Sequence, residues 1–175
     1  MRKVGTQLMA STPEGRFATK LRSNCQKIHF LKMDSWSTPG IPDLYGLYEH
    51  EETKLPGTFW AELKCTKINK LGLSPQQVAI NLKLSEYNIP NYILAESLSL
   101  RQLKIFPGFV VQDASTDGFK SKSHVACFKQ PYPWKEIEKS LMLDPRFTHH
   151  GYGIVSRGSG TGTRESSIRD IFHNI

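Results

Sequence analysis

Residues 40–67 read GIPDLYGLYEHEETKLPGTFWAELKCTK, and this stretch decides the fold. Two runs rich in apolar and aromatic residues, 43–49 and 58–66, flank a polar turn at 50–57. This order is typical of a β-hairpin, so we expect two antiparallel strands here.

The second strand of this hairpin carries two charged residues, Glu62 and Lys64. Side chains alternate along a strand, so these two point to the same face. Asp43 begins the first strand, directly after a turn that contains Gly and Pro. Pairing of the two strands would therefore bring Asp43 near Glu62. The alternative is a solvent-exposed strand face on which Glu62 and Lys64 have no chemical role.

A helix is predicted before the hairpin. Ser11 and Thr12 are N-cap candidates, Pro13 suits the first helical turn, and Ser11 with Glu14 has the spacing of a capping box. Phe17 follows three residues after Glu14, which places Glu14 near the inward face of this helix.

The remaining elements define the fold class. A strand is expected over 27–33, a helix over 74–87 and a further strand over 91–97. The last strand follows a helix, which favours a parallel or mixed-sheet partner. The sequence thus predicts an α/β core over residues 11–104, with a small mixed β-sheet flanked by helices.

Residues 105–175 are interpreted as a C-terminal extension of β/α elements. Strands are expected over 108–114 and 124–130, and a helix over 133–143. The final stretch from residue 151 is rich in Gly, Ser and Thr and is interpreted as a loop or tail.

The charge of the chain favours a polyanionic partner. The net charge is +7 over 175 residues, and residues 1–32 hold seven Lys or Arg residues against the single acid Glu14. Such a basic excess fits nucleic acid. A solvated, soluble surface is the alternative explanation.

Three widely spaced cysteines without a CxxC pair argue against a disulfide framework or a cysteine-based zinc site. We find no run of 18 apolar residues, so no membrane span is expected. The basic first 15 residues contain no apolar stretch of the kind found in a secretory signal. These features together predict a cytoplasmic protein.

The charged hairpin has the parts of a hydrolytic metal site. Two neighbouring carboxylates such as Asp43 and Glu62 repel each other unless a cation lies between them. Oxygen ligands of this kind suit Mg²⁺ or Mn²⁺. A lysine beside them can position or deprotonate a water, or stabilise a developing negative charge. Hydrolysis of a phosphodiester requires these parts.

Three motifs in this order resemble the PD-(D/E)xK nuclease superfamily, and within it the VRR-NUC type, the virus-type replication-repair nucleases. The motifs are Gly40-Ile41-Pro42-Asp43, then Glu62-Leu63-Lys64, then Ser74-Pro75-Gln76-Gln77, and a Glu lies on an earlier helix. The resemblance covers residues 14–97. It implies a restriction-endonuclease-like core and a Mg²⁺-dependent DNA endonuclease, for which Mn²⁺ can substitute. It also implies products with a 5′-phosphate, a branched DNA substrate such as a Holliday junction, and a homodimer.

The same resemblance assigns roles to individual residues. Asp43 and Glu62 would bind the metal, together with the backbone carbonyl of Leu63. Lys64 would position or activate the attacking water.

Two further catalytic candidates also have capping explanations. Gln77 would steady the site or the phosphate, but it also completes a capping box with Ser74. Glu14 would complete the site directly or through water, unless it only caps its own helix. Gln76 is the alternative to Gln77, one position out of register.

Basic side chains on the first helix and after the charged strand are candidates for contacts to DNA phosphates. They are Arg16, Lys20, Arg22, Lys67 and Lys70. Such contacts position a duplex without reading its sequence, and they weaken with salt.

Several other functions stay open at this stage. They are a sequence-specific restriction-type endonuclease, a DNA-binding protein on the same fold without hydrolysis, and a structural protein. Phage or mobile-element DNA processing, in the host cytoplasm, is implied by the resemblance alone. Residues 157–165 lack the Gly-Lys-Ser/Thr ending of a P-loop, and His149-His150 with His173-Asn174 fits neither a zinc site nor an HNH nuclease.

Overall fold

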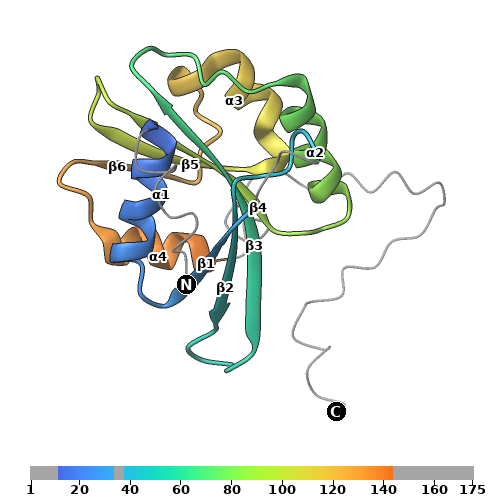
Figure 1. Ribbon diagram of the computed structural model, residues 1–175, viewed down its shortest axis with the longest axis vertical. Helices are drawn as coiled ribbons and strands as arrows, with labels where there is room; N and C mark the ends of the chain where they lie inside the picture. The colour runs from blue at the N-terminus through green and yellow to red at the C-terminus, as the bar shows by residue number, and fades with distance from the viewer. Residues whose placement is uncertain (1–11, 34–37, 144–175) are drawn as a thin grey trace, which may run out of the picture.

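The computed structural model describes residues 12–33 and 38–143 (Figure 1). The predictions for Ser11, for the tail from residue 151 and for the histidines at 149, 150 and 173 lie outside the described residues.

The described chain is a mixed α/β fold built on one six-stranded sheet with the strand order β1-β2-β3-β4-β5-β6. β3 and β4 pair in parallel, and every other neighbouring pair is antiparallel. The predicted α/β class and mixed sheet are confirmed. The strands are β1 (Ile28–Lys32), β2 (Leu44–Glu49), β3 (Pro56–Thr66), β4 (Asn91–Ser97), β5 (Gln102–Pro107) and β6 (Ala126–Lys129).

Helices cover both faces of this sheet, as Figure 1 shows. They are α1 (Pro13–Asn24), α2 (Pro75–Glu86), α3 (Val111–Asp117) and α4 (Trp134–Met142), with short 3₁₀ turns η1 (Gly108–Val110) and η2 (Gly118–Lys120). Phe17 of α1 and Ile137 of α4 are buried in one core cluster with Phe59 of β3. The α2–α3 face has its own cluster, which includes Ile93 and Phe106.

The register of the β2–β3 hairpin leaves part of β3 without a neighbour on one side. Leu44, the first residue of β2, pairs with Ala61, whereas β3 continues to Thr66. On its other side β3 stays paired with β4 as far as Thr66. The β2-facing edge of residues 62–66 therefore needs other hydrogen-bond acceptors for its backbone N–H groups.

The strand predicted over residues 108–114 was wrong. Residues 108–114 do not form a strand, because η1 and α3 occupy them. Val111 and Ala114, three residues apart, turn the same helical face inward and are both fully buried. β5, which the sequence analysis did not predict, lies just before them.

The expected division after residue 104 falls within β5. β6 extends the same sheet, and α4 packs into the same core as α1. Residues 105–143 are thus part of the sheet and its core. The helix predicted over 133–143 and the strand predicted over 124–130 are confirmed as α4 and β6.

In the described parts of the chain, no helix combines the length and the apolar character that crossing a membrane requires.

Candidate active site

Asp43 lies directly before β2. Beyond this point β3 has no strand neighbour on the β2 side. Its Oδ2 accepts a hydrogen bond of 2.8 Å from the backbone N–H of Leu63. This bond replaces the strand neighbour that β3 lacks here. The N–H and C=O of one strand residue point to the same side, so the carbonyl of Leu63 also faces the edge beyond β2.

The turn before Asp43 is shaped by Gly40. Gly40 has φ +92°, and a Cβ on it would lie 2.7 Å from the carbonyl carbon and oxygen of Gln76. Only glycine allows this conformation and this contact without strain. The turn therefore packs against the first turn of α2, which brings Asp43 and Gln77 to the same place.

Glu62 is the buried centre of the site. It is 0% exposed, so at this point the strand face is not the solvent-exposed face of the alternative explanation. Its Oε1 accepts from Nε2 of Gln77 at 2.5 Å and lies 3.0 Å from Nζ of Lys64. Its Oε2 has no hydrogen-bond partner among the described residues. A buried acceptor without a donor is costly unless another group binds it.

Lys64 connects this buried carboxylate to the surface. Its side chain is 16% exposed, compared with 0% for Glu62. The ammonium group therefore neutralises part of the buried charge and still reaches solvent. A donor placed in this way can hold a water or a phosphate oxygen that arrives from outside.

Gln77 performs the capping role and the site role at the same time. Its side-chain oxygen accepts from the backbone N–H of Ser74 at 3.0 Å, and its backbone N–H donates to Oγ of Ser74 at 3.2 Å. This complete capping box leaves Nε2 to donate to Glu62. Gln76, the alternative in the neighbouring register, is exposed.

Glu14 reaches the same edge of β3 from α1. Its Oε1 accepts from the backbone N–H of Cys65 at 3.2 Å. Thr12 is the N-cap of α1 and accepts from the N–H of Gly15 at 3.0 Å. The predicted N-cap Thr12 is confirmed, and the carboxylate of Glu14 contacts the edge of β3.

Burial and, after it, neighbouring acids raise the pKa values of the two central carboxyls. Burial, followed by the neighbouring charge of Asp43, raises the pKa of Glu62 from its ordinary value of 4.5 to about 7. Burial also raises the pKa of Asp43, and the nearby Glu14 adds to this, while the N–H of Leu63 and the charge of Lys64 oppose it. Asp43 and Glu62 therefore repel each other when both are ionised. A proton or a cation between them would remove the repulsion.

These residues fit a divalent cation with an incomplete protein shell. Within residues 12–33 and 38–143, no three His, Cys, Asp or Glu side chains form a metal site by themselves. The donors available are Asp43, the unpartnered Oε2 of Glu62 and the carbonyl of Leu63, which are all oxygen atoms. Mg²⁺ binds in this way, through one or two carboxylates, while it keeps several waters.

The candidate DNA contacts divide between α1 and the loop that follows β3. Arg16 and Arg22 are exposed on α1. The ammonium of Lys20 lies 2.8 Å from Oε1 of the buried Glu96, so much of its charge is already compensated. Lys67 and Lys70 are exposed in the loop that joins β3 to α2.

Gln77→Ala is expected to weaken Mn²⁺ binding, because Glu62 would lose a donor that orients it. Outer-shell partners of this kind change metal affinity by about 10–100-fold. Calorimetric titration with Mn²⁺ measures the effect, and Gln76→Ala, an exposed neighbour on the same helical turn, is the matched control. Equal Mn²⁺ affinities in the two variants would show that the Gln77 bond does not support the site.

Comparisons of the chain with protein-family models, with curated proteins and with solved structures find no match.

Proposed function

We propose that this protein is a metal-dependent DNA endonuclease of the PD-(D/E)xK type. The observation that carries the proposal is the convergence of five side chains from three elements and one turn on the unpaired edge of β3. They are Glu14, Asp43, Glu62, Lys64 and Gln77. A structural ion pair does not need a buried carboxylate oxygen without a donor, or a second carboxylate beside it.

Each polar residue of the site has its own role in the proposed reaction. Asp43, Glu62 and the carbonyl of Leu63 would hold Mg²⁺ or Mn²⁺. When bound, the metal supplies Lewis acidity toward a phosphodiester oxygen and lowers the pKa of a coordinated water. Lys64 donates hydrogen bonds to the attacking water or to a phosphate oxygen, and its charge stabilises the negative charge that develops at phosphorus. Gln77 keeps the carboxylate of Glu62 in one orientation.

Glu14 of α1 borders the site and binds the backbone of β3 next to it. By accepting from the N–H of Cys65, it holds the edge of β3 directly beyond the carbonyl of Leu63. Its negative charge also acts on Asp43. The total charge of Glu14, Asp43 and Glu62 exceeds that of Lys64, which favours a cation at this edge.

DNA is the proposed substrate, and branched DNA is the form that the motif resemblance favours. The net charge of +7 supports a polyanionic substrate. A homodimer that cuts two strands symmetrically belongs to the same proposal.

Cleavage of end-labelled DNA tests the proposal. The substrates are a four-way junction, a flap, a splayed arm, a single strand and a linear duplex, each with Mg²⁺, Mn²⁺ or EDTA. We expect metal-dependent cutting that leaves 5′-phosphates and that is lost in Asp43→Ala and Lys64→Ala.

The exposed pair Lys83–Glu86 on α2, with 3.1 Å between its charged atoms, provides a matched control. Lys83→Ala removes the same charge as Lys64→Ala and should cut like the wild type. Paired symmetric nicks in a junction would identify a resolvase. Absence of metal-dependent cutting on every substrate would overturn the proposal.

A further inference from the structure

Two loops lie against each other at the end of the sheet where β3 finishes. The backbone oxygen of Asn69 accepts from the N–H of Phe119 at 3.0 Å, and Nδ2 of Asn69 donates to the backbone oxygen of Asp117 at 2.8 Å. Between these two contacts, a Cβ on Gly118 would lie 2.0 Å from the oxygen of Asn69. The loop after β3 and the segment after α3 are therefore fixed to each other at backbone distance.

A buried lysine fixes the second loop to the sheet. Lys104 of β5 is only 7% exposed. Its Nζ donates to the backbone oxygens of Phe119 and Ser121, at 2.8 and 2.9 Å. Burying an ammonium group is costly unless it is well hydrogen-bonded, so these two bonds hold the segment firmly in one position.

Four lysines project from the paired loops, and we call them the loop-pair lysines. They are Lys67, Lys70, Lys120 and Lys122. All four are exposed, and none forms an ion pair with a carboxylate in the described parts of the chain. The acids on the same segment are Asp113, which accepts from the hydroxyl of Ser123 at 2.7 Å, and Asp117. The surface therefore keeps a net positive charge.

The first of these loops begins and ends at the candidate active site. It leaves β3 after Thr66, two residues beyond Lys64, and enters α2 at the capping box that contains Gln77. Its middle is fixed by Asn69. A phosphate bound by the loop-pair lysines would thus lie at a set distance from the reactive edge of β3, which is the kind of positioning that accelerates a reaction.

We propose that the loop-pair lysines form a contact surface for the phosphate backbone of duplex DNA. The inference rests on the proposed nuclease function and adds where the uncut part of the substrate is held. Single-strand binding surfaces stack bases on aromatic rings. In the paired loops, the aromatic ring of Phe119 is buried at 6% exposure and cannot serve in this way. Cations without an exposed ring favour backbone contact with a duplex.

Binding measured without cleavage separates this surface from the chemistry. Fluorescence anisotropy of a labelled blunt duplex, in EDTA, gives Kd across about 50–200 mM salt. We expect the variant with all four loop-pair lysines changed to alanine to bind at least about tenfold more weakly. Its slope of log Kd against log salt should fall by about 0.9 for each lost contact, or about 3 to 4 in all.

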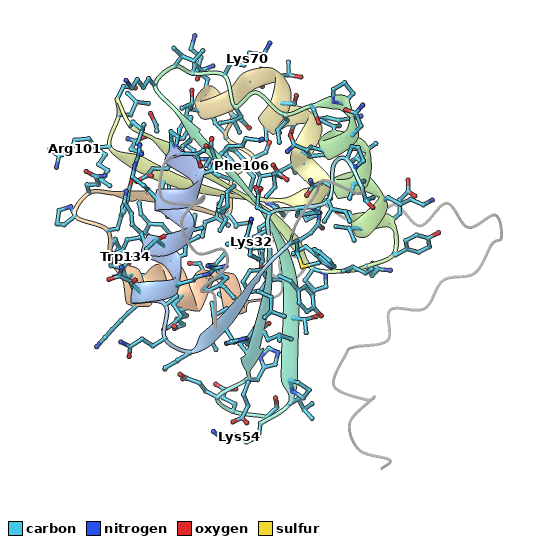
Figure 2. The ribbon with its side chains drawn as sticks, in the orientation of Figure 1. Lys32, Lys54, Lys70, Arg101, Phe106 and Trp134 are labelled. Atoms are coloured by element: carbon cyan, nitrogen blue, oxygen red, sulfur yellow. The ribbon has the colours of Figure 1, made fainter. Side chains whose placement is uncertain are left out.

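The control variant removes four exposed lysines from other parts of the surface. Figure 2 shows that Lys54, at the tip of the β2–β3 hairpin, lies at the opposite end of the protein from Lys70. A variant with the same loss of charge at such positions should keep most of the affinity and the salt slope. The control positions are Lys54, Lys83, Lys135 and Lys139.

Each outcome decides the inference separately from the nuclease proposal. Equal losses of duplex affinity in the two variants would mean that only the net charge of the protein matters. This result would overturn the proposed contact surface. Tighter binding of a single strand than of the duplex, still dependent on the loop-pair lysines, would overturn the duplex assignment. Selective loss of duplex binding in a protein that never cuts DNA would support the surface and contradict the nuclease.

Discussion

Replacing Glu62 with glutamine is expected to abolish DNA cleavage and to stabilise the metal-free protein above about pH 7. Loss of a metal ligand should lower the cleavage rate by more than about 100-fold, because even outer-shell partners change activity by 10–100-fold. Glutamine keeps an oxygen that can accept from Gln77 and Lys64, and its amide can donate to Asp43. The remaining charges of Asp43 and Lys64 compensate each other.

The expected gain in stability follows from the raised pKa of Glu62. An interval from 4.5 to about 7 corresponds to about 3 kcal/mol of unfolding free energy at 1.36 kcal/mol per pKa unit. Urea unfolding of the metal-free protein measures this difference. Glu86→Gln, an exposed position on α2, should change neither activity nor stability by a similar amount. A Glu62→Gln protein that still cuts DNA at the wild-type rate would contradict the assigned role.

The metal-free protein is expected to lose stability as the pH rises from about 4.5 to about 7. The folded state holds the proton of Glu62 more tightly than the unfolded state, since its pKa is raised to about 7. This contribution is therefore fully present below the ordinary pKa and is lost as the pH rises through about 7, by about 3 kcal/mol. The raised pKa of Asp43 acts in the same direction.

Unfolding free energies across this pH range, for the wild type and for Glu62→Gln, isolate the effect of the Glu62–Asp43 pair, because titrating groups away from it cancel in the difference. The difference should grow with pH and then level off. Mn²⁺ at 100 times its Kd should return about 2.7 kcal/mol to the wild type and much less to the variant. If the unfolding free energy changed with pH in the same way in both proteins, this would contradict a raised pKa of Glu62.

The elements with strong local signals were predictable from the sequence. The hairpin, a strand over 91–97 with a parallel partner in a mixed sheet, and the capped starts of α1 and α2 are confirmed. In each, the spacing of apolar residues agrees with a cap or a turn. Residues 108–114 were misassigned because the run Phe109-Val110-Val111 has high β-propensity, whereas Pro107 and Gly108 in fact end β5 and start a helical segment.

β5 was missed because its pattern contains a charged residue on a buried face. Lys104 interrupts the apolar alternation, and its burial depends on the carbonyls of Phe119 and Ser121, which come later in the chain. A buried lysine of this kind can be understood only after the tertiary contacts are known.

The candidate site residues were identifiable from motifs, but their contacts were not. Sequence spacing placed Asp43 near Glu62, yet it did not show that Asp43 accepts from the N–H of Leu63 or that Glu14 accepts from that of Cys65. Both bonds form because β3 extends past the end of β2, as the hairpin register requires. Gly40 was visible only as part of a turn, whereas its role is the close contact with Gln76.

The rate of DNA cleavage against Mn²⁺ concentration, for the wild type and for Asp43→Asn, tests most directly whether this edge of β3 is a metal-dependent nuclease site. Glu86→Gln, at an exposed carboxylate on α2, is the control. We predict a saturable, Mn²⁺-dependent rate for the wild type and the control, and no saturable cleavage for Asp43→Asn. Cleavage that is independent of metal, or an Asp43→Asn curve that matches the wild type, would contradict the site described here.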